Sequence, residues 1–314
     1  MHKWSFGLAK TFAQACTVVL IAAFGVATAA AAPIPVVTTT SMVTDLVEQI
    51  GGDRIAVSGL MGPGVDPHLY KPSTRDITRL HAAKAVFYNG LMLEGRMGEL
   101  FERLGKSGRK TYAVAGALAG KDLLTPAEFE GHPDPHVWGD AKLWAACVDT
   151  VVRGLSEVDP GGAQEFAKRG AAYKAELMKL HDWALERVQE LPEGSRHLVT
   201  SHDAFNYFGR AYGFKVVGVQ GISTVSEAGL ADITKVVDFI KSKKVKAIFV
   251  ESSVPKATIE RISQDSGAKV GGELYSDALG APGTKVTAHG ETYDEGTYIG
   301  MLKHNNNTAV DALK

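Results

Sequence analysis

The sequence predicts an α/β fold with two lobes, each a four-stranded, mainly parallel sheet flanked by helices, joined by one long rigid helix. Short β-branched runs alternate with helical patterns through residues 33–314, which is typical of parallel sheets covered by helices. A long helical pattern near the middle separates the strands into two groups of four. The chain also has the size at which single cores tend to divide.

The first 32 residues have the layout of a cleavable secretory signal. Lys3 and Lys10 precede an apolar stretch from about residue 15 to 27, and four alanines lead to Pro33. The apolar stretch is shorter than the roughly 20 residues that a bilayer span needs. Cys16 lies at the start of the apolar core, whereas a cysteine for lipid attachment should follow that core. We therefore expect cleavage near Ala32, a periplasmic location, no stable membrane span and no lipid anchor.

The composition of the mature chain excludes several classes of protein. Residues 33–314 carry 32 basic and 35 acidic side chains, a net charge of about −3, and contain no basic patch, so nucleic acid is not an expected partner. Cys147 is the one thiol left after cleavage, so no intramolecular disulfide can form. A monomer is expected.

Four β-branched runs are expected as strands in each half. The first half, an N-terminal lobe over residues 33–160, has them at about residues 34–39, 55–60, 85–88 and 111–114. The second half, a C-terminal lobe over residues 193–314, has them at about 197–201, 215–219, 247–251 and 269–274.

Residues 161–192 are predicted to form the connecting helix. Apolar residues recur there at steps of three, four and seven and form one stripe, and no proline or glycine occurs from Ala171 to Leu191. Gly161-Gly162 and Pro192 supply the ends. A coiled-coil dimer segment would need more sustained heptads, so we interpret this helix as a rigid strut.

The most informative pattern is a set of metal-ligand residues far apart in sequence. Asp-Pro-His occurs twice, ending at His68 and His136, and His202 and Asp277 follow at intervals of 66 and 75 residues. Each of the four comes after the carboxyl end of a predicted strand, where open α/β sheets bind ligands. Three imidazoles and one carboxylate can fill a tetrahedral shell around one divalent ion without leaving a place for water.

Each of these residues also has an ordinary structural interpretation. Ser201-His202-Asp203 could cap a helix, although the histidine is not needed for that, and Asp277 could serve only in a turn. Asp66 and Asp134 could accept the outer N–H of a ligating imidazole or simply shape a turn. Glu227 and Glu251 could support ligands or belong to a helix start and a strand end.

The chain resembles the metal-receptor family of bacterial ABC importers for manganese, zinc and iron(II), also called cluster A-I or cluster nine solute-binding proteins. The resemblance runs from about Val36 to the C-terminus. It depends on six segments that occur in order, namely 64–70, 88–95, 134–138, 200–205, 248–252 and 275–280.

The resemblance implies two lobes bridged by a long helix, with His68, His136, His202 and Asp277 at the four ligand positions of the family. It implies a protein that is not an enzyme, which captures Mn²⁺, Zn²⁺ or Fe²⁺ as transported ligand and delivers it to an inner-membrane permease with its ATPase. Zinc receptors of the family often carry a His-rich loop where this chain has only His132, and strict manganese receptors often have Glu at the place of His202. The sequence leaves the ion, its affinity and the identity of the permease undetermined.

Two other functions compete with this interpretation. Three His and one Asp can also build the centre of a secreted zinc hydrolase, but no His-Glu-x-x-His occurs and no open coordination position is expected. A surface adhesin on the same scaffold is the second alternative, which nothing in the sequence favours.

Overall fold

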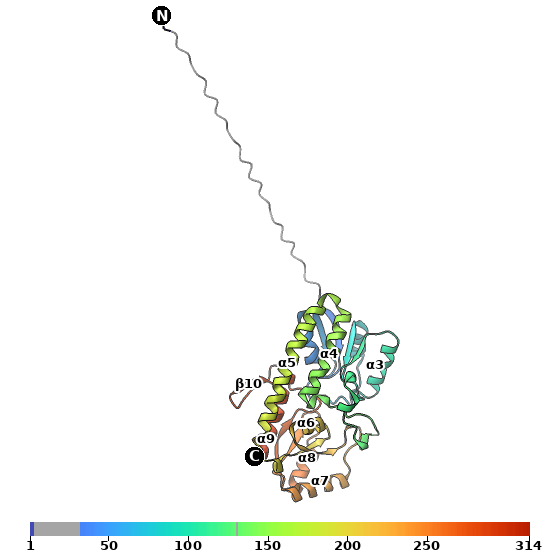
Figure 1. Ribbon diagram of the computed structural model, residues 1–314. Helices are drawn as coiled ribbons and strands as arrows, with labels where there is room; N and C mark the ends of the chain where they lie inside the picture. Colours follow the sequence, from blue (N-terminus) through green and yellow to red (C-terminus); the bar gives the residue numbers. More distant parts are fainter. Residues whose placement is uncertain (3–31, 130) are drawn as a thin grey trace. The chain divides into compact units, whose positions relative to one another are not determined.

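The computed structural model describes residues 1–2, 32–129 and 131–314, and it separates a unit Met1–Ala32 from one compact unit, Pro33–Lys314 (Figure 1). Most of the predicted signal segment, including Cys16, lies outside the described residues. Its cleavage and the exact lobe boundaries remain predictions.

The first lobe is built on a parallel four-stranded sheet in the order β2-β1-β3-β4. Its strands are β1 (Ile34–Thr38), β2 (Ile55–Gly59), β3 (Ala85–Tyr88) and β4 (Thr111–Ala113). Its helices are α1 (Ser41–Gly51), α2 (Thr74–Ala82), α3 (Arg96–Lys106) and α4 (Ala141–Val158). The strands agree with the expected runs to within one residue at each end.

Side chains at the helix starts explain where two of these helices begin. Ser73 and Asp76 form a capping box at α2, since each side chain accepts from the backbone N–H of the other. Asp140 precedes α4 and accepts from Lys142 N. The segment between β4 and α4 therefore ends at Asp140, and His136 lies just before that residue.

The second lobe contains four strands that hydrogen-bond in two parallel pairs. β5 (His197–His202) pairs with β6 (Lys215–Gln220), and β7 (Ala247–Glu251) pairs with β8 (Lys269–Leu274). All four predicted strands are present and β5 lies next to β7, although the structure records two separate two-stranded sheets with no ladder between them. The helices of this lobe are α6 (Asn206–Tyr212), α7 (Leu230–Lys243), α8 (Ala257–Ser266) and α9 (Tyr298–Leu313).

Several short elements were not expected from the sequence. An antiparallel hairpin joins β9 (Lys285–Ala288) to β10 (Glu291–Asp294). Single-turn 3₁₀ helices occur at Gly52–Arg54, Ala115–Ala117, Gly120–Asp122, Ala127–Phe129, Val137–Gly139, Pro160–Gly162 and Glu193–Ser195.

The long helix α5 (Ala163–Val188) contacts both lobes. It packs against α1 and α4 of the first lobe and against α6 and α9 of the second, and Figure 1 shows it running along both. Tyr173 donates to Asp45 Oδ2 in α1 at 2.8 Å, and Arg187 Nε donates to Asn307 Oδ1 in α9 at 2.9 Å. The predicted apolar stripe is buried, from Phe166 to Val188. The helix is thus fixed to each lobe by a buried polar contact.

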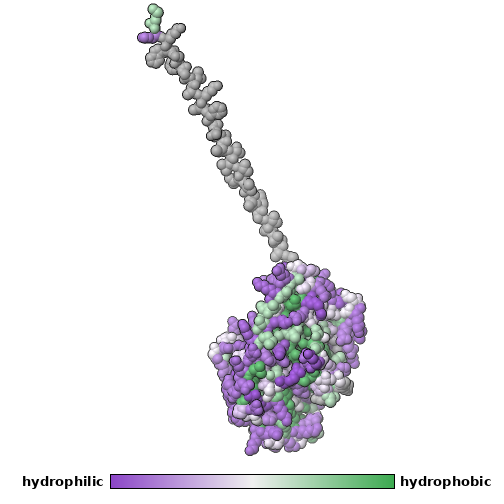
Figure 2. Space-filling view, viewed as in Figure 1, coloured by the Kyte–Doolittle hydropathy of each residue, from purple (hydrophilic) through white to green (hydrophobic). Residues whose placement is uncertain are grey.

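The largest hydrophobic core cluster includes residues of both lobes and of α5, so the lobes share buried apolar surface. Two smaller clusters among the described residues lie within single lobes. Hydrophilic residues cover most of the visible face of the compact unit, with apolar residues between them (Figure 2).

Candidate metal centre

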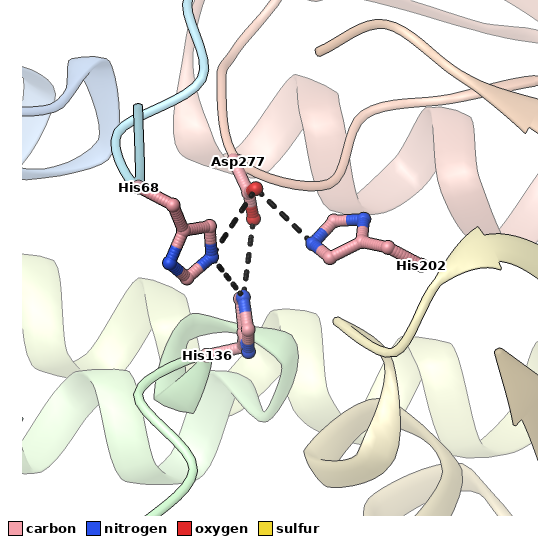
Figure 3. Close-up of side chains that lie close together, drawn as sticks. All are labelled: His68, His136, His202 and Asp277. Carbon is pink, nitrogen blue, oxygen red and sulfur yellow. Dashed lines mark hydrogen bonds and ion pairs between the residues drawn. The ribbon is translucent and has the colours of Figure 1, made fainter. Parts of the chain in front are cut away.

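The four residues singled out by the sequence converge at one point between the lobes (Figure 3). His68 lies on the loop after β2, and His136 directly precedes the 3₁₀ turn Val137–Gly139. His202 is the last residue of β5, and Asp277 lies three residues after the end of β8. Each lobe contributes two side chains, all from carboxyl ends of strands or the loops that follow them.

The distances between the inward-facing atoms suit a tetrahedral ion. His68 Nε2 and His136 Nε2 are 3.3 Å apart, His136 Nε2 and Asp277 Oδ1 are 3.4 Å apart, and His202 Nε2 and Asp277 Oδ2 are 3.2 Å apart. Bonds of about 2.0–2.1 Å to a tetrahedral Zn²⁺ place neighbouring donors about 3.3 Å from each other. His68 Nε2 is farther from Asp277 Oδ2, at 3.8 Å, and all four donors lie within 4.8 Å of one another.

The inward-facing atoms are buried and incompletely paired. The side chains of His136, His202 and Asp277 are 0 % exposed, and that of His68 is 3 % exposed. Within the described ranges, His202 Nε2 and both carboxylate oxygens of Asp277 have no hydrogen-bond partner. Because buried polar atoms are almost always paired, such a cluster indicates a ligand. The residues fit one divalent ion.

The two Asp-Pro-His segments share one turn but differ in their outer contacts. Asp66 Oδ1 accepts from the backbone N of His68 at 2.8 Å, and Asp134 Oδ1 accepts from that of His136 at 2.9 Å. Asp134 Oδ1 is also 2.8 Å from His136 Nδ1, so it orients the imidazole. Asp66 makes no such contact with the His68 ring. The sequence left two roles open for these aspartates, orienting the imidazole or shaping the turn. Asp134 does both, whereas Asp66 only shapes the turn.

Glu251 orients the ring of His202 in the same way that Asp134 orients the ring of His136. Its Oε1 accepts from His202 N at 2.8 Å, and its Oε2 contacts His202 Nδ1. Glu251 does end strand β7, as its sequence position indicated, yet it also fixes the ring of the third histidine. Glu227 is exposed and has no such role. The helix-cap interpretation of Ser201 and Asp203 is wrong, since α6 starts at Asn206 and its N-cap residue is Phe205.

The loop that carries Asp277 is held from two sides by residues that sequence reasoning did not single out for this role. Trp138 Nε1 donates to the carbonyl of Ser276 at 2.8 Å. Asn305 of α9 accepts from Tyr275 N at 2.9 Å and donates to Tyr275 O at 2.7 Å. No local signal at Asn305 could have indicated this contact, because it joins residues 30 positions apart.

The electrostatics of the cluster separate the histidines. Burial lowers the pKa of His68 to about 3, and the attraction of Asp277 does not offset it. Burial also disfavours a charged His202, but the adjacent carboxylates of Glu251 and Asp277 outweigh it and hold the pKa of His202 well above its usual value. Burial alone would raise the pKa of Asp277, yet the three imidazoles, His202 first, hold it well below its usual range. The metal-free site therefore keeps an anionic Asp277 beside a protonated His202 and a neutral His68.

Two further observations bear on the setting of the site. His132, four residues before His136, is exposed and takes no part in the cluster. Within the part of the chain that the structure describes, no helix is both long and apolar enough to cross a bilayer.

Comparison with known proteins supports the same assignment. The family model for the zinc-uptake complex component A, periplasmic (ZnuA), matches residues 36–312. The manganese-binding lipoprotein MntA of Bacillus subtilis (strain 168) is 45% identical over 284 residues, which cover 89% of this chain and 89% of MntA. The zinc-binding protein TroA of Treponema pallidum (strain Nichols) is 44% identical over 297 residues, which cover 93% and 92%.

A solved structure agrees over nearly its whole length. The periplasmic zinc binding protein TroA from Treponema pallidum matches with a TM-score of 0.83 at 43% sequence identity, over 90% of this chain and 99% of TroA. The family match over residues 36–312 spans both lobes, the connecting helix and all four converging residues. With the fold, the donor set and the matched residues in agreement, this chain belongs to the ZnuA family of metal-binding components of ABC importers.

Proposed function

We propose that this protein captures one divalent metal ion with His68, His136, His202 and Asp277 and delivers it to the permease of an ATP-driven importer. The observation that carries the proposal is the convergence of three imidazoles and one carboxylate, all buried, with donor separations that suit a single tetrahedral ion. The family is that of solute-binding proteins of such importers, and the close relatives are named for the metals that they bind.

The donor set favours carrying an ion over using it in catalysis. Four protein ligands complete a tetrahedral shell, so no position is left for the water that a zinc hydrolase activates. The near-zero exposure of the four side chains also leaves no room for an organic substrate beside the ion. Hydrolysis of ester or peptide substrates that disappears in His136→Ala would favour the hydrolase instead.

The identity of the ion is argued from donor chemistry and from relatives. MntA is named for manganese, TroA for zinc and MtsA of Streptococcus pyogenes serotype M1 for iron. Imidazole and carboxylate donors bind Zn²⁺ more tightly than Mn²⁺. We expect tighter Zn²⁺ binding in a competition titration even if Mn²⁺ is the transported ion, and equal or tighter Mn²⁺ binding would contradict this order.

Two experiments test the function at different levels. An ion present at a hundredfold above its dissociation constant should add about 2.7 kcal/mol to the free energy of unfolding. A melting temperature that no divalent ion changes between nanomolar and millimolar concentration would contradict metal binding. Uptake of each ion by a deletion strain, complemented with wild type or His202→Ala, then tests transport and identifies the ion.

We further propose that the mature protein begins at Pro33 and works in the periplasm as a monomer without a lipid anchor. Several relatives, MntA among them, are named lipoproteins. In this chain the position of Cys16 at the start of the apolar core, rather than after it, argues against lipid attachment. The mass of the exported protein decides the matter, because lipid on Cys16 would retain residues 16–32 and add the mass of the acyl chains.

A further inference from the structure

A side-chain hydrogen bond between Thr224 and Asp66 crosses between the lobes beside the metal centre. Thr224 of the second lobe donates from Oγ1 to Asp66 Oδ2 of the first lobe at 2.6 Å. Thr224 is 6 % exposed and lies on the loop between β6 and α7. The acceptor is the carboxylate that precedes His68 by two residues.

Asp66 transmits this contact to a ligand. Its other oxygen, Oδ1, accepts from the backbone N of His68 at 2.8 Å. The same loop approaches the second lobe at Gly64, where a Cβ atom would lie 3.4 Å from the carbonyl oxygen of Ser252. The backbone that carries His68 is therefore linked through Asp66 to the opposite lobe, and Thr224 supplies the hydrogen-bond donor.

Thr224 is itself fixed with respect to His202. Gln220 is the register partner of His202 between strands β5 and β6. The side-chain amide of Gln220 donates to the carbonyls of Thr224 at 3.0 Å and of Ser226 at 2.7 Å. A hydrogen-bonded path thus runs from the strand end that bears His202, through Gln220, Thr224 and Asp66, to His68.

His68 is the histidine ligand whose position depends most on such a contact. Asp134 holds the ring of His136 and Glu251 holds that of His202. Among the described residues, no side chain makes a hydrogen bond with His68 Nδ1, and His68 lies on a partly exposed loop beside the exposed Leu69. The position of the His68 ring consequently depends on the position of its backbone.

We propose that Thr224 is a positioning residue that, through Asp66, holds His68 on the ion and so sets the rate at which the ion leaves. This inference deepens the proposed function and rests on it. When the Thr224–Asp66 bond opens, the His68 loop loses its tie to the second lobe, and the ion keeps three of its four protein ligands. Release begins at His68, while His136, His202 and Asp277 remain in place.

The test is the rate of Zn²⁺ release from the full mature protein into an excess of an absorbing chelator. Thr224→Val keeps the shape of the side chain and removes the hydroxyl, and Thr224→Ser restores the hydroxyl. The valine variant should release Zn²⁺ about tenfold faster, as expected for the loss of a hydrogen bond to a carboxylate. The serine variant should stay within about twofold of wild type.

Controls separate positioning from a general loss of stability. Thr287→Val removes a hydroxyl contact in the exposed hairpin, with Thr292, and should leave the release rate unchanged. Because the bond is present without metal, Thr224→Val should also lower the metal-free melting temperature, whereas Thr224→Ser should keep the wild-type value. If Thr224→Val does not fold, Thr224→Ala is judged by the same criteria.

The outcomes are distinguishable from failure of the proposed function. Wild-type protein that binds no Zn²⁺ contradicts the function itself. Wild-type protein that binds Zn²⁺, with a valine variant that releases it at the wild-type rate, overturns only the role of Thr224. A serine variant as fast as the valine variant does the same, since the hydroxyl would then not be the cause.

Discussion

Asp66 and Asp134 occupy the same place in two identical tripeptides, yet only Asp134 contacts an imidazole ring. The tripeptide fixes the turn, because each carboxylate accepts from the histidine backbone. Whether the carboxylate also reaches the ring depends on neighbours from other parts of the chain, such as Thr224 at Asp66 and Asn206 at Asp134. Local sequence therefore predicts the donors well and the partners of those donors poorly.

Glu251 provides a prediction at the same scale. Glu251→Gln keeps an acceptor for His202 N but removes the charge that faces His202 Nδ1. Loss of such a carboxylate partner should weaken Zn²⁺ binding by about 10–100-fold, as measured by competition with a chelator of known affinity. Glu227→Gln is the matched control, because Glu227 is exposed and lies outside the cluster. Equal affinities for both variants would show that Glu251 only ends the strand.

At the scale of elements, the strands of both lobes could be predicted because β-branched runs bounded by turn residues rarely form anything other than a strand. The hairpin β9–β10 was missed because its strands are short and polar. His289 and Gly290 at its turn have φ of 52° and 80°, as a two-residue hairpin turn of type I′ requires. The His-Gly pair was the available signal, but it is weaker than Asn-Gly or Asp-Gly.

The connecting helix makes a testable contact with the first lobe. Tyr173→Phe removes the hydroxyl that donates to the buried carboxylate of Asp45. Because that acceptor is buried, we expect a loss of about 1–3 kcal/mol in the free energy of unfolding, measured by urea denaturation of the metal-free protein. Tyr112→Phe removes a hydroxyl bonded to the exposed Glu157 and should cost less. Equal losses would mean that α5 is not pinned at this point.

At the scale of the whole molecule, the metal centre could be predicted because its donors are chemically distinctive and follow strand ends. Their separations could not be predicted, since these depend on how the two lobes pack around α5. The same holds for Asn305 and Trp138, which brace the Asp277 loop across 30 and 138 residues of sequence. Contacts of this kind exist only in the folded chain.

The raised pKa of His202 predicts proton release on metal binding. At pH 7 the metal-free protein holds a proton on His202 and none on His68, whose pKa is lowered to about 3. An ion coordinates only the neutral ring, so binding should release about one proton and tighten as the pH rises from 6.5. Calorimetry in buffers of different ionisation enthalpy measures the proton count. A count of zero between pH 6.5 and 8 would contradict the assignment.

The same pKa values give opposite pH dependences of stability for the two forms. His202 has a raised pKa in the folded metal-free protein, so its contribution to stability is complete below about 6.5 and is lost as the pH rises through the folded value. The metal-bound form carries the neutral ring, so its stability rises with pH up to about 6.5, where the unfolded histidine loses its proton, and is level above that. The difference between the two melting temperatures should therefore widen with increasing pH.

Trp138 touches both halves of the metal centre. Its ring centroid lies 5.3 Å from that of His136, and its indole N–H holds the carbonyl next to Asp277. The indole of Trp138 can consequently serve as an intrinsic fluorescence reporter of metal binding. Indole emission should respond to filling of the site without any attached dye, and a paramagnetic ion such as Mn²⁺ should quench it more strongly than closed-shell Zn²⁺.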